Sequence, residues 1–149
     1  MGQKIFLVIT RLSLGWLMFY AGITKVLDPA WSAAFYLKGA KLFPGFYAWL
    51  LSPSILPVVN FVNAWGLTLL GVSLILGVMV RLSAPLGALL MILYYLPILD
   101  FPYPNAHAYI VDEHIIYAVL LLYFASVRAG RTFGLDAVLT KKSILSKLG

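Results

Sequence analysis

The sequence contains no cysteine and few charged residues. The absence of cysteine excludes disulfides, thiol redox chemistry, iron–sulfur clusters and covalently attached c-type haem. Only 11% of the 149 residues are charged, whereas about a quarter is usual in soluble domains. Because 62% of the residues are hydrophobic and the mean hydropathy is +0.96, water cannot be the main solvent of this chain. We therefore expect an integral membrane protein.

The basic residues lie at the ends of apolar runs rather than in one cluster. The net charge of +6 would suit a nucleic acid, but the basic residues are not interleaved with exposed aromatic residues. Their placement fits the charge bias that orients membrane proteins. One side of the membrane would carry Lys25, Lys38 and Lys41. The other side would carry Lys4, Arg81, Arg128, Arg131, Lys141, Lys142 and Lys147. We therefore expect both termini in the cytoplasm and no nucleic-acid partner.

Four apolar stretches are long enough to cross the hydrocarbon core as helices, which takes roughly 20 residues each. They cover residues 5–27, 56–80, 82–99 and 108–127. Pro29 would end the first stretch, and VRLSAP would make a tight turn between the second and third, with Arg81 at the boundary. The alternating pattern of a β-barrel is absent. Residues 1–149 therefore predict one all-α domain, a four-helix transmembrane bundle in the lipid bilayer, with residues 128–149 as a cytoplasmic tail.

The segment 28–57 is too long for a plain connector and too broken by proline and glycine to be a fifth span. It is rich in aromatic residues: Trp31, Phe35, Tyr36, Phe43, Phe46, Tyr47 and Trp49. Tyrosine and tryptophan favour the level of the lipid headgroups. We therefore expect one or two short amphipathic helices on the outer surface, which act either as an interfacial anchor or as a lid over a site between the spans.

Polar groups from four predicted helices fall at a similar depth near the outer face. At a rise of about 1.5 Å per residue, Asp112 lies roughly 24 Å above Arg128 at the inner boundary. Lys25, Asn60, Asn63 and Asp100 come to similar heights by the same estimate. Ionisable groups in a membrane cost least near the interface and beside a partner. We therefore expect one polar layer in the outer part of the bundle.

Helical spacing predicts which of these groups face one another. Glu113, His114 and Tyr117 share one face of the fourth helix, whereas Asp112 points elsewhere. Two packing seams with the spacing of close helix pairs contain Arg11, Gly15, Met18, Gly22 and Lys25 in the first helix, and Asn60, Asn63, Leu67, Gly71, Leu74, Val78 and Arg81 in the second. Lys25, Asn60 and Asn63 would then meet Glu113 and His114 inside the bundle. The same groups would equally serve as hydrogen bonds that hold the helices together.

The polar residues do not match a standard metal or nucleophile pattern. His107 and His114 do not have the spacing of a zinc site, and no Ser–His–Asp arrangement, phosphate-binding loop or pair of haem-binding histidines is present. We therefore predict no metal site and no intrinsic metal or haem cofactor.

Several stretches resemble the DoxX/DoxD family of small four-helix membrane proteins. They are RLSLGWLMFYAGITKVLDPAW in the first helix, NFVNAWGLTLLGVSLILGVMVRL in the second, YIVDEHIIYAVLLL in the fourth and AGRTFGLDAVL after it. The resemblance covers nearly the whole chain. It implies a multi-pass protein in the inner or plasma membrane of a prokaryote. Within that family, the DoxD branch is the membrane subunit of a thiosulfate:quinone oxidoreductase, which couples two thiosulfates to tetrathionate and passes the electrons to quinone.

The resemblance also implies roles for the polar layer. Quinone would bind without a covalent link, as a substrate, and Glu113 and His114 would handle its protons as the catalytic pair. Lys25, Asn60, Asn63 and Asp112 would bind the anionic substrate, and Trp65, Tyr94 and Tyr117 would contact the quinone ring. A partner subunit is also implied, because the archaeal enzyme has a second subunit that this chain does not contain. The alternative is a non-catalytic accessory or scaffold subunit of a larger membrane complex, in which the polar layer only locks the helices.

Overall fold

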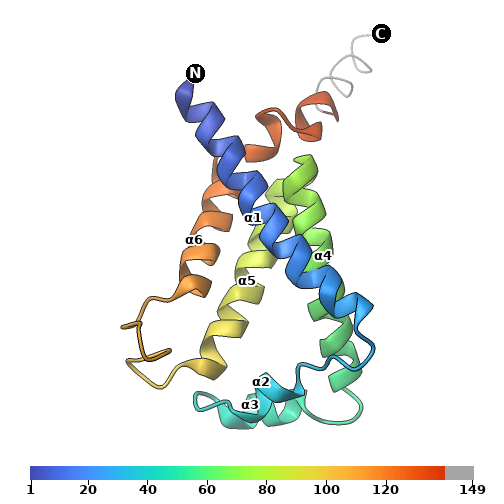
Figure 1. Ribbon diagram of the computed structural model, residues 1–149, viewed down its shortest axis with the longest axis vertical. Helices are drawn as coiled ribbons and strands as arrows, with labels where there is room; N and C mark the ends of the chain where they lie inside the picture. Colours follow the sequence, from blue (N-terminus) through green and yellow to red (C-terminus); the bar gives the residue numbers. More distant parts are fainter. Residues whose placement is uncertain (140–149) are drawn as a thin grey trace.

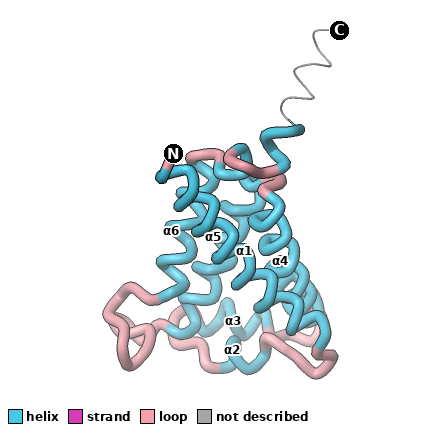
Figure 2. Tube along the Cα trace, turned by 45° about the horizontal axis from the view of Figure 1, so that its top comes forward, coloured by secondary structure: helices cyan, strands magenta, loops and turns pink. Residues whose placement is uncertain are grey.

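The computed structural model describes residues 1–139, and the regular elements of that part of the chain are helical. Their order is α1 (Gly2–Leu27), α2 (Ala34–Lys38), α3 (Pro44–Leu50), α4 (Leu56–Leu76), α5 (Val80–Ile98), α6 (Glu113–Ser126) and the 3₁₀-helix η1 (Ala129–Arg131). The N-terminus and η1 lie at one end of the bundle, which we call the terminal end, and α2 and α3 lie at the other, the α2–α3 end (Figures 1 and 2). The predicted tail lysines Lys141, Lys142 and Lys147 lie outside the described residues.

Within residues 1–139, helices α1, α4 and α5 are long and apolar enough to cross a membrane. The predicted fourth span, 108–127, is wrong at its start, because α6 begins only at Glu113 and has 14 residues. At about 1.5 Å per residue it is about 21 Å long, short of a core of about 30 Å. Asp112 is extended and caps this helix by accepting hydrogen bonds from the backbone N–H groups of His114 and Ile115. The ionisable residues therefore form the cap and first turn of α6 rather than its middle.

The turn between α4 and α5 lies earlier than the sequence predicts: α4 ends four residues before, and α5 begins two residues before, the predicted positions. Helix α4 ends at Leu76 because Gly77 takes the left-handed conformation (φ 64°) that a residue without Cβ adopts at low cost. Helix α5 begins at Val80, so Arg81 lies in its first turn rather than between the helices. The carboxylate of Asp136 accepts hydrogen bonds from the Met79 and Val80 N–H groups at 2.8 and 3.3 Å, so a distant side chain caps this helix.

Helices α1 and α4 pack closely against each other, and the N-terminal part of α1 extends away from α4 (Figure 1). A Cβ on Gly22 would lie 2.3 Å from the backbone nitrogen of Thr68, and one on Gly71 would lie 2.3 Å from that of Phe19. The two glycines therefore let the backbones approach more closely than any other residue would allow. The predicted seams are largely confirmed, since their buried members are Arg11, Gly15, Met18, Gly22, Asn63, Leu67, Gly71 and Leu74.

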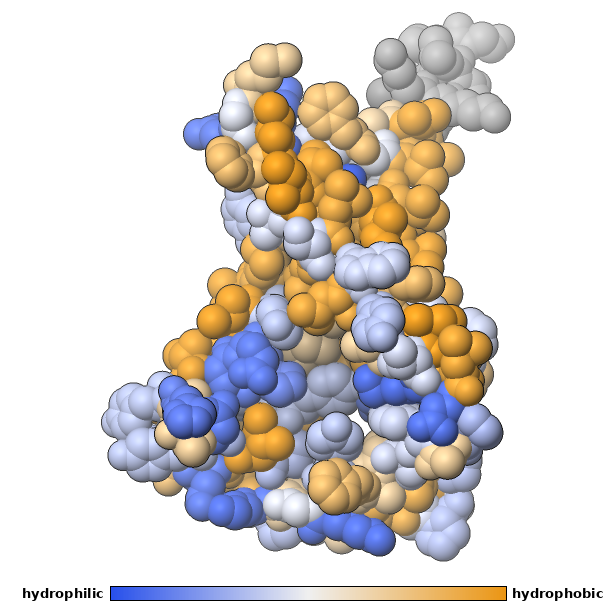
Figure 3. Space-filling model, in the orientation of Figure 1, coloured by the Kyte–Doolittle hydropathy of each residue, from blue (hydrophilic) through white to orange (hydrophobic). Residues whose placement is uncertain are grey.

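Helices α5 and α6 form a second closely packed pair, and both pairs share one apolar core. The core brings together buried side chains from all four helices, with Met18, Leu74, Ala84 and Leu121 among them. Apolar side chains also cover much of the surface that faces away from this core, and hydrophilic groups gather mainly towards the α2–α3 end on the face drawn in Figure 3. This distribution suits a bundle surrounded by lipid.

The segment 28–57 contains two short helices, as predicted, and closes the α2–α3 end of the bundle (Figure 1). Its own small core consists of Ala33, Leu37 and Tyr47, which pack against residues of α4 and α5. Tyr47 is 1% exposed, and its hydroxyl donates a hydrogen bond of 3.1 Å to the carbonyl of Leu93. That carbonyl needs a donor from elsewhere because Pro97, four residues on, has no N–H. Burial raises the pKa of the Tyr47 hydroxyl, so the group remains a neutral donor.

The terminal end is closed by the chain that follows α6. Arg11 of α1 is 1% exposed, and its guanidinium donates hydrogen bonds to the carbonyls of Ala129 (2.7 Å) and Thr132 (3.0 Å). The Asp136 backbone N–H donates to the carbonyl of Gly77 at 2.9 Å. Residues 129–136 are therefore fastened to α1 and to the α4–α5 turn.

Candidate functional site

A chain of polar side chains crosses three helices near the α2–α3 end of the bundle. It consists of Asn63 of α4, Tyr94 of α5, His114 in the first turn of α6 and Asp112 at its cap, and we call it the polar chain. Asn63 and Asp112 are buried, while Tyr94 and His114 are half-buried. Polar groups inside a membrane bundle are rare and commonly functional, so this cluster is the candidate site.

One end of the polar chain is a pair formed by Asp112 and His114. Asp112 Oδ2 lies 2.8 Å from His114 Nδ1, and Asp112 Oδ1 accepts the His114 N–H at 3.0 Å. The prediction that Asp112 points away from His114 is therefore wrong. Helical spacing does not apply to Asp112, because its φ of −119° and ψ of −173° are extended and turn the carboxylate back over the first turn. An ionised Asp112 requires the hydrogen on His114 Nδ1, which leaves Nε2 for proton exchange.

The other end of the polar chain is a hydrogen bond between α4 and α5. The hydroxyl of Tyr94 donates to the side-chain carbonyl of Asn63. The Tyr94 ring also meets the His114 ring edge-on, with the ring centroids 6.0 Å apart. Tyr94 therefore stands between the amide of Asn63 and the imidazole of His114. The sequence singled out Tyr94 as a ring contact, but not as the link between these two groups.

The other residues predicted around quinone lie beside or outside this chain. Glu113 is exposed at the start of α6. Tyr117 is half-buried one turn along α6 from His114 and packs against the apolar core. Trp65 is 41% exposed on α4, with its ring near Phe61, so it lies on the outside of the bundle. Glu113 and Tyr117 are thus neighbours of His114 along the helix, whereas Trp65 is a surface residue.

Lys25 and Asn60 form a separate cluster with the start of the segment 28–57. Asn60 accepts the Ala33 N–H at 2.9 Å and exchanges a hydrogen bond with the hydroxyl of Ser32. The Lys25 ammonium donates to the Ala21 carbonyl at 2.6 Å and lies 5.4 Å from the centroid of the Trp31 ring. Each residue holds the start of this segment, and among the described residues neither side chain forms a hydrogen bond or ring contact with the polar chain, although Asn60 lies one turn from Asn63 on α4.

Asp112, Glu113 and His114 also place potential metal ligands within 4.8 Å of one another. The contacts of these residues argue against that use. Asp112 Oδ1 accepts two backbone N–H groups, and Asp112 Oδ2 is paired with His114 Nδ1. Among these three residues, only the Glu113 carboxylate and His114 Nε2 take no part in these hydrogen bonds. Two ligands are fewer than a closed protein metal site requires.

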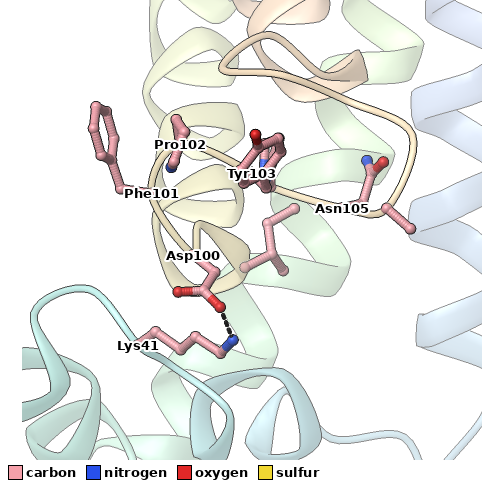
Figure 4. A pocket seen from close by; sticks show the side chains of 9 residues that line it. Lys41, Asp100, Phe101, Pro102, Tyr103 and Asn105 are labelled. Carbon is pink, nitrogen blue, oxygen red and sulfur yellow. Dashed lines mark hydrogen bonds and ion pairs between the residues drawn. The ribbon is translucent and has the colours of Figure 1, made fainter.

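An open cavity of about 490 Å³ lies beside the loop that joins α5 to α6 (Figure 4). Lys41 reaches it from the α2–α3 connection and forms an ion pair with Asp100, while Tyr103 and Asn105 line it from the loop. The loop is held by two isolated bridges, Asp100 with Tyr103 and Asn105 with Ala108. The Tyr95 hydroxyl also donates to the carbonyl of Ile110 and so fastens the far end of the loop to α5. The positive charge of Lys41 is thus already matched by a carboxylate.

A comparison with known protein families shows which family the chain belongs to. The DoxX family model matches residues 6–101. The chain belongs to the DoxX family. The match includes Asn63 and Tyr94 of the polar chain but ends before Asp112 and His114. Neither the comparison with curated proteins nor the comparison with solved structures finds a match. Membership of the DoxX family and the apolar helices together identify a membrane protein.

Proposed function

We propose that this DoxX family protein is a quinone-linked redox membrane protein, similar to the membrane subunit of a thiosulfate:quinone oxidoreductase. The observation that carries the proposal is the polar chain, which places a histidine with a carboxylate partner beside a tyrosine in an otherwise apolar bundle. A quinone arrives through the lipid and needs protons as well as electrons. The polar chain offers proton-exchanging groups at the depth where such a ligand would be held.

The reaction balances with two thiosulfates for each quinone. A bond forms between the terminal sulfurs of two thiosulfate ions, which gives tetrathionate and releases two electrons. The quinone takes up these two electrons and two protons to become the quinol. In our proposal His114 Nε2 delivers a proton to a quinone oxygen, Asp112 stabilises the imidazolium that precedes the transfer, and exposed Glu113 exchanges protons with water. Tyr94 and Tyr117 would contact the ring.

The anionic donor would approach from the α2–α3 end. The Lys25 ammonium lies there over the Trp31 ring, and Lys41 lines the open cavity beside the α5–α6 loop. The ion pair of Lys41 with Asp100 is exposed on both sides, so its attraction is weak and an arriving dianion would compete for the lysine. A partner subunit at this end would supply further contacts for the donor.

The test is thiosulfate-dependent reduction of a quinone by the purified protein in lipid nanodiscs. His114→Gln and Glu113→Gln remove the proposed proton groups, and Tyr94→Phe removes only the hydroxyl bonded to Asn63. His107→Gln is the matched control because His107 is exposed in the loop before α6 and outside the polar chain. We expect loss of at least about a hundredfold in kcat for His114→Gln, the low end of what a positioned acid or base contributes, and no change for His107→Gln. Equal activity in all variants would contradict the proposal.

A specific observation also favours an accessory or scaffold role as the second candidate. Asp112 already serves as the cap of α6, and Tyr94 already links α5 to α4. Every member of the polar chain therefore has a structural task. In this case the same substitutions would lower the unfolding midpoint in detergent or the yield of an assembled complex, and the wild-type protein alone would neither bind nor reduce quinone.

A further inference from the structure

The terminal end of the molecule is strongly basic. Four of the five acidic residues, Asp28, Asp100, Asp112 and Glu113, lie towards the α2–α3 end. At the terminal end of the described chain the acidic side chain is Asp136, and its carboxylate accepts hydrogen bonds from two backbone N–H groups of the α4–α5 turn. Basic residues at the same end are Lys4, Arg11, Arg81, Arg128 and Arg131. The surface at this end therefore carries a positive field.

An open cavity of about 710 Å³ lies in this basic surface. It is formed by the start of α1, the last turn of α4 and the chain after η1. Two exposed cations, Lys4 and Arg131, lie at its edge, and its walls include Ile75, Leu76 and Phe133. The cavity thus combines positive charge with an apolar wall, and that wall continues into the apolar outer surface of α4.

The walls of the cavity are fixed by the contacts beneath it. The buried guanidinium of Arg11 holds the carbonyls of Ala129 and Thr132, and the Asp136 N–H bonds to Gly77. Phe133 has a φ of 50°, a left-handed conformation that a bulky residue rarely adopts, and the residue is 78% exposed. The backbone therefore presents an aromatic ring outward beside the two cations.

We propose that this cavity binds an anionic phospholipid. The phosphate lies between Lys4 and Arg131, and an acyl chain runs along Ile75, Leu76 and Phe133 towards the lipid-facing side of α4. A basic cavity at the level of the headgroups is the usual site for such lipids. A free phosphate ion would use the two cations alone and leave the apolar wall without an occupant. The site lies at the opposite end from the polar chain and is independent of the proposed function.

The experiment is native mass spectrometry of the full chain released from a neutral detergent. Phosphatidylglycerol is titrated against phosphatidylcholine with the same acyl chains. We expect wild-type protein to retain phosphatidylglycerol selectively. Lys4→Gln combined with Arg131→Gln should weaken the binding of phosphatidylglycerol by about tenfold or more, because two basic residues near the headgroup no longer attract it. Both residues are exposed, so the double variant should keep its fold.

The matched control is Arg81→Gln combined with Arg128→Gln, which removes the same charge from the same end but from residues that do not line the cavity. We expect this control to bind phosphatidylglycerol within about threefold of wild type. Arg81 and Arg128 do not line the cavity, and salt screens the attraction between the headgroup and charges outside it. Equal binding of the two lipids, or equal loss in the two double variants, would overturn the proposal. Displacement of the lipid by millimolar inorganic phosphate, with no dependence on acyl-chain length, would also overturn it.

Discussion

The hydrogen bond between Tyr47 and Leu93 makes a quantitative prediction about how the α2–α3 end is held. Tyr47→Phe removes the hydroxyl and leaves the Leu93 carbonyl without that donor. An unsatisfied buried acceptor costs about 1–3 kcal/mol, so we expect a loss of this size in the free energy of unfolding. Phenylalanine keeps the ring that fills the small core with Ala33 and Leu37, so the change isolates the hydroxyl.

Pro97 provides the internal control for this prediction. Pro97→Ala restores an N–H at the position four residues after Leu93, where a helix supplies the donor itself. In that background Tyr47→Phe should cost less than about 1 kcal/mol, because the Leu93 carbonyl keeps a partner. The two single variants and the double variant form a cycle whose coupling energy we expect to be about 1–2 kcal/mol.

The assay is reversible unfolding in mixed micelles, with protease cleavage of the segment 28–57 as a local readout. Cleavage of this segment should accelerate in Tyr47→Phe and return towards the wild-type rate in the double variant. The reasoning is refuted if Tyr47→Phe costs the same with proline and with alanine at position 97.

Substitutions at three further positions test other contacts of the fold. Arg11→Gln should lower the free energy of unfolding by about 2–4 kcal/mol, measured in micelles, because two charge-assisted hydrogen bonds, one buried and one part-buried, are lost. Gly71→Ala should lower the free energy of unfolding by about 1–3 kcal/mol in the same assay, since the new Cβ would lie 2.3 Å from the Phe19 backbone nitrogen. An unchanged unfolding midpoint would argue against the close packing of α1 on α4. Asp112→Ala should cost about 1 kcal/mol through loss of the α6 cap, whereas Asp112→Asn should cost less.

The sequence was sufficient to predict the three long helices α1, α4 and α5 and the faces on which α1 and α4 pack, but not all of the helix boundaries. Spacing of small residues at Gly15, Gly22 and Gly71 indicated the α1–α4 seam because helix pairs of this kind approach closely only where side chains are small. The same spacing argument failed for Asp112, since it assumes helical backbone angles and Asp112 lies just outside the helix. A helix cap reverses the direction of its side chain, so a shift of a few residues in the predicted boundary changes which groups meet.

Contacts between distant segments could not be read from local pattern. Nothing near Arg11 in the sequence indicates that its partners are carbonyls more than a hundred residues away. Pro97 did carry a usable signal, because a proline near the end of a helix implies an unpaired carbonyl four residues earlier. The sequence alone did not reveal that Tyr47 supplies the donor. Asn63, Tyr94 and His114 were each selected for their chemistry, and only the structure orders them into one chain.

The most direct test of the central claim is the quinone assay on His114→Gln and His107→Gln side by side in nanodiscs. Each variant removes one imidazole, but only His114 is paired with a buried carboxylate and packed against Tyr94. The account predicts that thiosulfate-dependent quinone reduction falls at least about a hundredfold in His114→Gln and is unchanged in His107→Gln, with equal unfolding midpoints. Full activity in a correctly folded His114→Gln protein would contradict it.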